Sequence, residues 1–183
     1  MKGLNDMEKA FIEEKAYELL KQGSFSDDGA VDVVQLAKNL GFAVLNVQSK
    51  AVTDDLDGFL LINEDDNNIL DTKSNRVIGV NVNREFDVKR FIIAHELGHF
   101  KLKYAGERIF AMRDSKHGRS EEENEIDFFA ACLLMPRNGF IKSYEDAKNE
   151  APENVIKRLA CEFKVPEKGV LRRLQELDLV ELK

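Results

Sequence analysis

The chain of 183 residues has no tryptophan, only three prolines and only two cysteines. Cys132 and Cys161 lack CxxC spacing, and Cys132 lies in an apolar run with helical periodicity, so we expect both thiols to be buried and reduced. No apolar run approaches the length of a membrane span, and the first ten residues lack the apolar core of a signal peptide. These absences predict a soluble, cytoplasmic protein.

Positive charge is also in short supply, with 27 lysines and arginines against 34 acidic residues and a formal net charge of −7. This balance argues against a protein whose main task is to bind the nucleic-acid backbone, although a local basic face remains possible. The length and the 43% hydrophobic content suit one compact core with a small addition. We divide the chain into residues 1–136 and a C-terminal helical region, 137–183.

Histidine is scarce as well, and two of the three histidines stand in the segment FIIAHELGHFK, residues 91–101. On a helix His95 and His99, at i and i+4, project from one face and can bind one metal ion, which this ligand type and spacing predict to be zinc. Glu96 lies about 100° further round, where a carboxylate can accept a proton from a water at that site. The motif therefore predicts hydrolysis with Glu96 as the general base.

Residues before this motif predict a mixed fold. Helical periodicity covers residues 6–21 and 30–39, and β-prone segments follow at 42–47, 58–62 and 76–82. The expected fold class is α+β, with a small sheet over the HExxH helix as in zincins, an analogy at the level of the fold. Residues 106–120, after the helix, read as a long charged loop able to form a lid or a substrate rim.

A catalytic zinc site needs a third protein ligand. His117 is a weak candidate because it lies in a polar stretch without helical pattern. The helix predicted from EEENEIDFFAACLLMP, residues 121–136, is the better source. Glu125 falls one turn before Phe129, where burial of an unpaired carboxylate is costly, so we predict Glu125 as the third ligand. Glu122 is a possible rival.

Other acidic residues of the same predicted helix receive other roles. Glu121 and Glu123 are expected at an exposed helix N-terminus, where negative charge is favourable. Asp127 is expected to accept a hydrogen bond from a ligand imidazole and so to fix its tautomer. For the oxyanion of the reaction the sequence leaves several candidates open, namely His117, Tyr104, Arg113 and Arg119.

The segments RFIIAHELGHFKL (90–102) and ENEIDFFAACLLMP (123–136) together resemble the signatures of the ImmA/IrrE family of metallopeptidases. The resemblance covers roughly residues 31–136. It implies zinc bound by His95, His99 and Glu125, with Glu96 as the base. It also implies site-specific cleavage of a helix-turn-helix transcriptional repressor, which relieves repression. The alternative is a non-catalytic regulatory protein that binds a repressor or DNA and keeps a structural zinc site.

In the C-terminal region, apolar residues of the run from residue 154 onward predict two helices joined by a short turn at Val165 and Pro166. This pattern is helix-turn-helix-like. Direct DNA contact by these helices is possible but less expected than a structural or partner-docking role, because the chain is acidic. The oligomeric state is left open.

Overall fold

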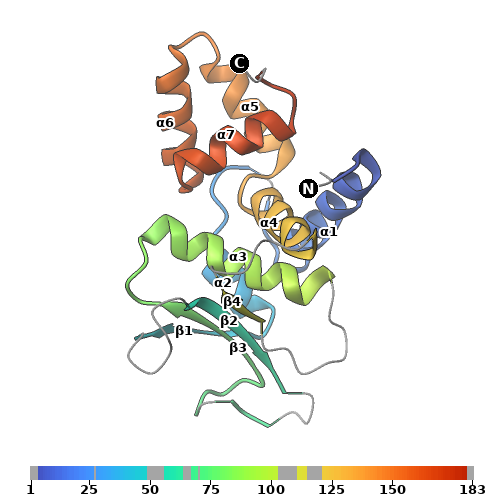
Figure 1. Ribbon diagram of the computed structural model, residues 1–183, viewed down its shortest axis with the longest axis vertical. Coiled ribbons are helices and arrows are strands. Elements are labelled where there is room, and N and C mark those ends of the chain that lie inside the picture. The colour runs from blue at the N-terminus through green and yellow to red at the C-terminus, as the bar shows by residue number, and fades with distance from the viewer. Residues whose placement is uncertain are drawn as a thin grey trace.

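The computed structural model describes residues 4–26, 28–48, 56–63, 67–69, 71–102, 111–114 and 121–180. It confirms the mixed α+β class (Figure 1). In chain order the described elements are α1 (Asp6–Gln22), α2 (Val33–Asn39), β1 (Ala43–Val47), β2 (Leu56–Ile62), β3 (Arg76–Asn81), α3 (Phe86–Leu102), β4 (Ala111–Asp114), α4 (Glu121–Leu134), α5 (Arg137–Ala147), α6 (Pro152–Phe163) and α7 (Glu167–Glu176).

The described strands form a four-stranded sheet in the order β1-β3-β2-β4. β1 runs parallel to β3, with Ala43 opposite Val77, whereas β2 runs antiparallel to β3, with Gly58 opposite Val80. The first three strands lie where the sequence predicts them. β4 pairs antiparallel with β2, so the prediction of a continuous loop over residues 106–120 is wrong for residues 111–114. The rest of that segment lies outside the described residues.

Helices cover one face of the sheet in successive layers (Figure 1). α3 lies directly against β2 and β3, α4 packs on α3, and α1 packs on α4. The buried apolar side chains of these layers belong to one continuous core, which extends to α5, α6 and α7. Burial of this apolar area is the main stabilising contribution to the fold. It also means that polar groups on the inner faces of α3 and α4 sit in water-poor surroundings.

α3 and α4 approach closely at Gly98. A Cβ atom at this position would lie 2.9 Å from Cγ2 of Ile126 and 3.1 Å from Cδ1 of Phe129. Both distances are shorter than ordinary van der Waals contact, so the absence of a side chain lets the two helices come together. This contact brings the histidines of α3 opposite the first turns of α4.

The C-terminal helices are joined to α3 by a buried arginine. Arg90 donates hydrogen bonds to the carbonyl oxygens of Val31 (2.8 Å), Lys164 (3.0 Å) and Phe163 (3.4 Å). The last two carbonyls end α6, where Lys164 adopts the left-handed conformation with φ 53°. A cation is favourable at a helix C-terminus. The predicted pair of helices joined by a short turn is thus present, and its turn is attached to the helix that carries the HExxH motif.

Both cysteines are free thiols. Cys132 is buried, as predicted, and burial raises its pKa to about 12, which makes it a poor nucleophile. Cys161 is exposed, so the prediction of its burial is wrong; it lies on the outer face of the amphipathic α6. No helix in the described part of the chain is both long enough and apolar enough to cross a membrane.

Candidate metal centre

The HExxH helix places two imidazoles side by side in the interior. His95 is 1% exposed and His99 is 6% exposed, and their ring centroids lie 4.9 Å apart. The i, i+4 spacing accounts for this, because residues one turn apart share a face of a helix. The face concerned looks toward α4, which is held close by the contact at Gly98.

The carboxylate opposite the two imidazoles is that of Glu123. Its Oε2 lies 3.2 Å from Nε2 of His95, and its Oε1 lies 3.6 Å from Nε2 of His99. Within the described residues, these three side chains form a group whose candidate ligand atoms all lie within 4.8 Å of one another. We call His95, His99 and Glu123 the metal cluster.

The metal cluster fits a zinc ion. Two ligands of a tetrahedral zinc ion, with bonds of about 2.0–2.1 Å, lie roughly 3.3 Å apart. The separation of 3.2 Å between Nε2 of His95 and Oε2 of Glu123 is close to that value, and all three candidate ligand atoms lie within 4.8 Å of one another. Two imidazoles and one carboxylate also form the ligand set of zinc hydrolases, in which a fourth position is kept for water or substrate.

Asp127 lies against the first of the two imidazoles. Its Oδ1 lies 3.0 Å from Nδ1 of His95, and its side chain is only 3% exposed. A hydrogen bond donated by Nδ1 fixes the tautomer in which the lone pair of Nε2 points at the metal cluster. The predicted hydrogen-bond contact between Asp127 and an imidazole of the HExxH motif is therefore confirmed.

The carboxylate that the structure brings to the imidazoles differs from the one predicted as the third ligand, and the identity of that ligand itself stays a prediction. The metal cluster contains Glu123, whereas neither Glu125 nor its rival Glu122 belongs to it. The physical reason is the phase of α4. Asp127 and Glu123 are four residues apart and share a face, but Asp127 and Glu125 are two apart and point about 200° away from each other. Glu123 was expected to be exposed, yet its side chain is 35% exposed and reaches inward.

Glu96 lies beside the metal cluster on the side of the sheet. It is 1% exposed, and a Cβ atom placed on Gly58 of β2 would lie 3.5 Å from its Oε1 and 2.3 Å from Cγ2 of Ile92. The missing side chain at Gly58 thus lets β2 approach α3 where the carboxylate sits. A carboxylate in a water-poor site next to a metal cluster is suited to proton transfer.

The charges within the site support one another. Burial alone lowers the pKa of His95, but hydrogen bonds to Asp127 and Glu123 outweigh it and raise that pKa to about 9. The hydrogen bond from His95 in turn holds the pKa of Glu123 below its ordinary value. An imidazole in this state must release its proton to bind a metal, so metal affinity should rise with pH.

The prediction of an oxyanion-stabilising residue stays untested. His117, Tyr104 and Arg119 lie outside the described residues, and Arg113 is described only through the backbone of β4. The described side chains of the site are therefore the metal cluster, Glu96 and Asp127.

Two facing imidazoles, an opposed carboxylate and a buried glutamate define a metallopeptidase-like site. Comparison with protein families agrees with this class. Residues 53–175 match the IrrE N-terminal-like domain of the peptidase M78 family, so the chain belongs to that family. The match includes α3 with the HExxH motif, α4 with Glu123, and most of α7. A search of curated proteins found no match.

Proposed function

We propose that the protein is a zinc-dependent metalloendopeptidase of the ImmA/IrrE type. The observation that carries the proposal is the convergence of His95, His99 and Glu123 beside the buried Glu96. The site residues are assigned as His95, His99 and Glu123 for the metal and Glu96 for proton transfer. A zincin-like core, with the sheet packed along the HExxH helix, is the fold that this proposal implies.

The chain's own residues supply most of the steps of peptide hydrolysis. Zinc, when bound, acts as a Lewis acid that makes water more acidic and polarises the scissile carbonyl. Glu96 accepts the proton that the attacking water loses as its oxygen bonds to the carbonyl carbon. The same carboxyl then gives that proton to the leaving amine as the C–N bond breaks. Asp127 keeps the ring of His95 in place throughout.

The proposed substrate is a helix-turn-helix transcriptional repressor, cut at a specific site so that repression is relieved. The support for this substrate is the resemblance of the two signature segments to the ImmA/IrrE family, reinforced by the family match. The reaction belongs to the cytoplasm, where such repressors act. The pair α6 and α7 is proposed as a helix-turn-helix-like surface that docks a protein partner.

The test compares wild type with Glu96→Gln, and uses Glu153→Gln as a control at an exposed glutamate of α6. The candidate repressor is the product of a neighbouring reading frame, and its fragments are identified by mass after co-incubation. We expect Glu96→Gln to bind zinc like the wild type and to cleave about 10²–10⁴ times more slowly. Glu153→Gln should retain full activity.

A competing proposal is a regulatory protein that binds a repressor or DNA and keeps zinc for structure only. The same variant separates the two. If Glu96→Gln relieves repression as well as the wild type does, and the repressor remains intact, the peptidase proposal is wrong and the binding protein is favoured.

A further inference from the structure

Two consecutive arginines of α7 point in different directions. Arg173 is fully buried; it donates a hydrogen bond to the carbonyl of Met135 (3.2 Å) and forms an ion pair with Glu13 of α1. We call Arg173 with these two partners the arginine anchor. Arg172, the residue before it, projects about 100° away around the helix axis, and its side chain is 41% exposed.

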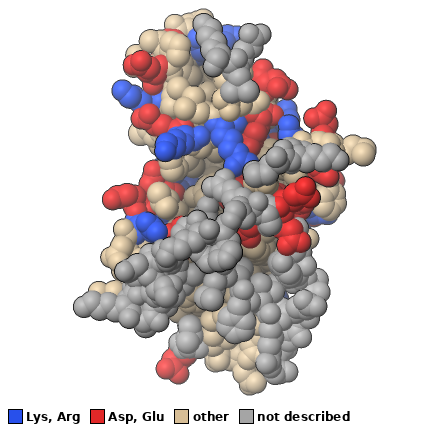
Figure 2. Space-filling view, viewed as in Figure 1, with Lys and Arg blue, Asp and Glu red and all other residues tan. Residues whose placement is uncertain are grey.

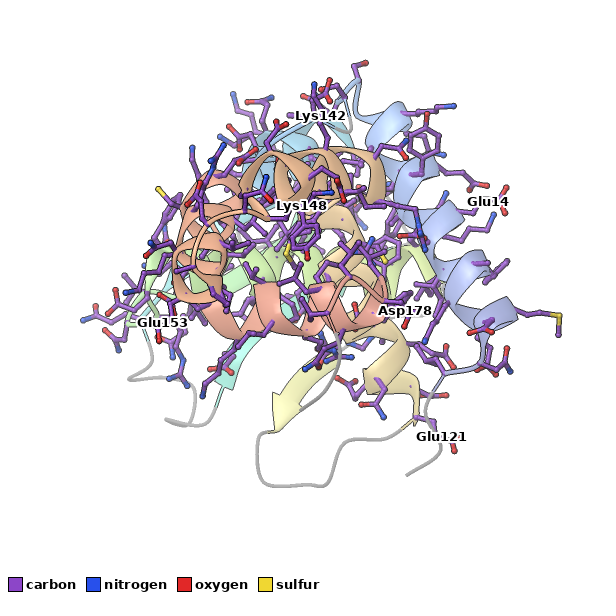
Figure 3. All side chains as sticks on the ribbon, turned by 90° about the horizontal axis from the view of Figure 1, so that it is seen from above. Glu14, Glu121, Lys142, Lys148, Glu153 and Asp178 are labelled. Atoms are coloured by element: carbon purple, nitrogen blue, oxygen red, sulfur yellow. The ribbon has the colours of Figure 1, made fainter. Side chains whose placement is uncertain are left out.

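The anchor fixes where α7 lies. Seen from above, Asp178, two residues beyond the end of α7, lies toward α1 (Figure 3). Basic side chains gather on the face of the molecule where α7 lies, with acidic side chains next to them (Figure 2). Arg173 ties α7 to α1 and to Met135 just after α4, and the neighbouring Arg172 lies near Asp127 of α4.

Arg172 reaches the residue that orients the metal ligand. Its Nε donates a hydrogen bond to Oε1 of Glu176 at 2.8 Å, and its Nη1 lies 4.0 Å from Oδ2 of Asp127. The other oxygen of Asp127, Oδ1, lies 3.0 Å from Nδ1 of His95. One carboxylate therefore faces an imidazole with one oxygen and a guanidinium with the other.

We infer that Arg172 is a positioning residue of the metal centre, acting through Asp127 on His95. The inference rests on the proposed function, because it assigns Arg172 to the same zinc site. It also gives α7 a part in that site, in agreement with a family match that continues to residue 175.

The physical reason lies in the geometry of Asp127. Rotation of a carboxylate about its side-chain bonds turns the acceptor oxygen away from His95. A cation opposite the second oxygen favours the orientation in which one oxygen faces His95 and the other faces the cation. Arginine suits this role, since its planar fork can hold Glu176 with one nitrogen while another faces Asp127. Lysine cannot hold both in the same way.

The experiment measures the dissociation constant for zinc in competition with a chromophoric chelator, using the full chain. Loss of a group that orients a metal ligand typically weakens metal binding 10–100-fold. Arg172 acts one contact further away, at 4.0 Å, so we expect Arg172→Met to weaken zinc binding by about threefold to tenfold. Arg172→Lys should show a smaller loss.

Arg158→Met is the matched control, because Arg158 is similarly exposed (46%) and also pairs with a glutamate, Glu150, at 2.6 Å. It should bind zinc like the wild type, and the thermal midpoints of the zinc-free variants should agree. The decisive comparison uses Asp127→Asn, in which Arg172→Met should have no further effect.

Three results would overturn the inference: unchanged zinc binding in Arg172→Met, tighter binding, or an equal loss in the presence and absence of Asp127→Asn. Failure of the wild type itself to bind zinc would be a different result, since it would overturn the proposed function.

Discussion

Two buried polar clusters lie close to α4, and they differ in the kind of partner that faces their carboxylates. In the metal cluster Glu123 faces the imidazoles of His95 and His99. In the arginine anchor Glu13 faces the guanidinium of Arg173. An imidazole can release its proton and become a metal ligand, whereas a guanidinium stays charged and cannot bind a metal.

The comparison teaches that burial of charge does not by itself identify a functional site. A carboxylate paired with arginine has its counter-charge built into the fold, so the pair can only stabilise or specify packing. A carboxylate paired with two imidazoles can instead bind a metal ion together with them, once the imidazoles have released their protons. Variants that remove one member of each cluster should therefore have separable effects, on stability in one case and on metal binding in the other.

The largest expected effect is on stability at the arginine anchor. Arg173→Met removes the buried guanidinium that faces Glu13 and Glu176. Each glutamate keeps a second arginine partner, Arg137 or Arg172, so the cost should approach but not exceed the roughly 3–5 kcal/mol of breaking a buried pair. Denaturant unfolding of the zinc-free protein measures this loss. Arg158→Met, at an exposed ion pair, should lose less than about 1 kcal/mol. If Arg173→Met and Arg158→Met are equally stable, the arginine anchor does not stabilise the fold more than an exposed ion pair does.

The next effect is on metal binding and separates Glu123 from Glu125. Glu123→Gln removes a ligand of the metal cluster, so zinc affinity should fall by more than about a hundredfold, beyond the usual cost of losing an outer partner. Glu125→Gln, two residues along the same helix, should stay within about twofold of the wild type, as expected for a side chain outside the cluster. Equilibrium competition with a chelator measures both. The reverse order of effects would restore Glu125 as the ligand.

This pair of residues also shows how far the sequence alone could lead. The positions of His95, Glu96 and His99 were predicted because a five-residue motif on one helix fixes them relative to each other. The third carboxylate depends on how α4 is rotated against α3, which the motif on α3 does not determine. The four-residue spacing between Glu123 and Asp127 was the available signal, since one face of α4 must supply both the ligand and its orienting partner.

The fold shows the same division between local and long-range information. Helical periodicity predicted helices, and β-prone residues predicted the first three strands, because each of these signals extends over five residues or more. β4 has four residues in a charged segment, and its pairing with β2 is a contact between residues about 50 positions apart. The contacts of Arg90 and Arg172 likewise join α3 and α4 to the C-terminal helices, which is beyond any pattern within one segment.

A smaller effect is expected where β2 meets α3. Gly58→Ala would place a Cβ atom 2.3 Å from Ile92 and 3.0 Å from the carbonyl of Gly79, so β2 must move and the variant should lose about 1–3 kcal/mol. Glu96 lies next to the same contact, so cleavage should slow while zinc affinity is kept. In the control Gly169→Ala the added atom meets only Met135, at 3.9 Å, and stability should not fall. Equal stability of both variants would contradict this packing.

The smallest effect, and the one that depends on pH, concerns the acidic side of the arginine anchor. Burial alone raises the pKa of Glu13, but the charge of Arg173 and hydrogen bonds from Arg137 and Arg173 outweigh it and hold that pKa below the ordinary value of 4.5. A depressed pKa in the folded state contributes stability above pH 4.5, and this contribution is lost as the pH falls through the folded pKa.

Glu13→Gln should therefore be less stable than the wild type by about 1–2 kcal/mol at pH 7, the scale of a hydrogen bond to a charged group. The difference should shrink as the pH falls below 4.5. Glu14→Gln is the neighbouring control on the exposed side of α1 (Figure 3) and should match the stability of the wild type at pH 7. Zinc affinity should be unchanged in both variants at pH 7, because neither residue belongs to the metal cluster. A difference in stability that persists unchanged at low pH would mean that Glu13 acts through packing, without its charge.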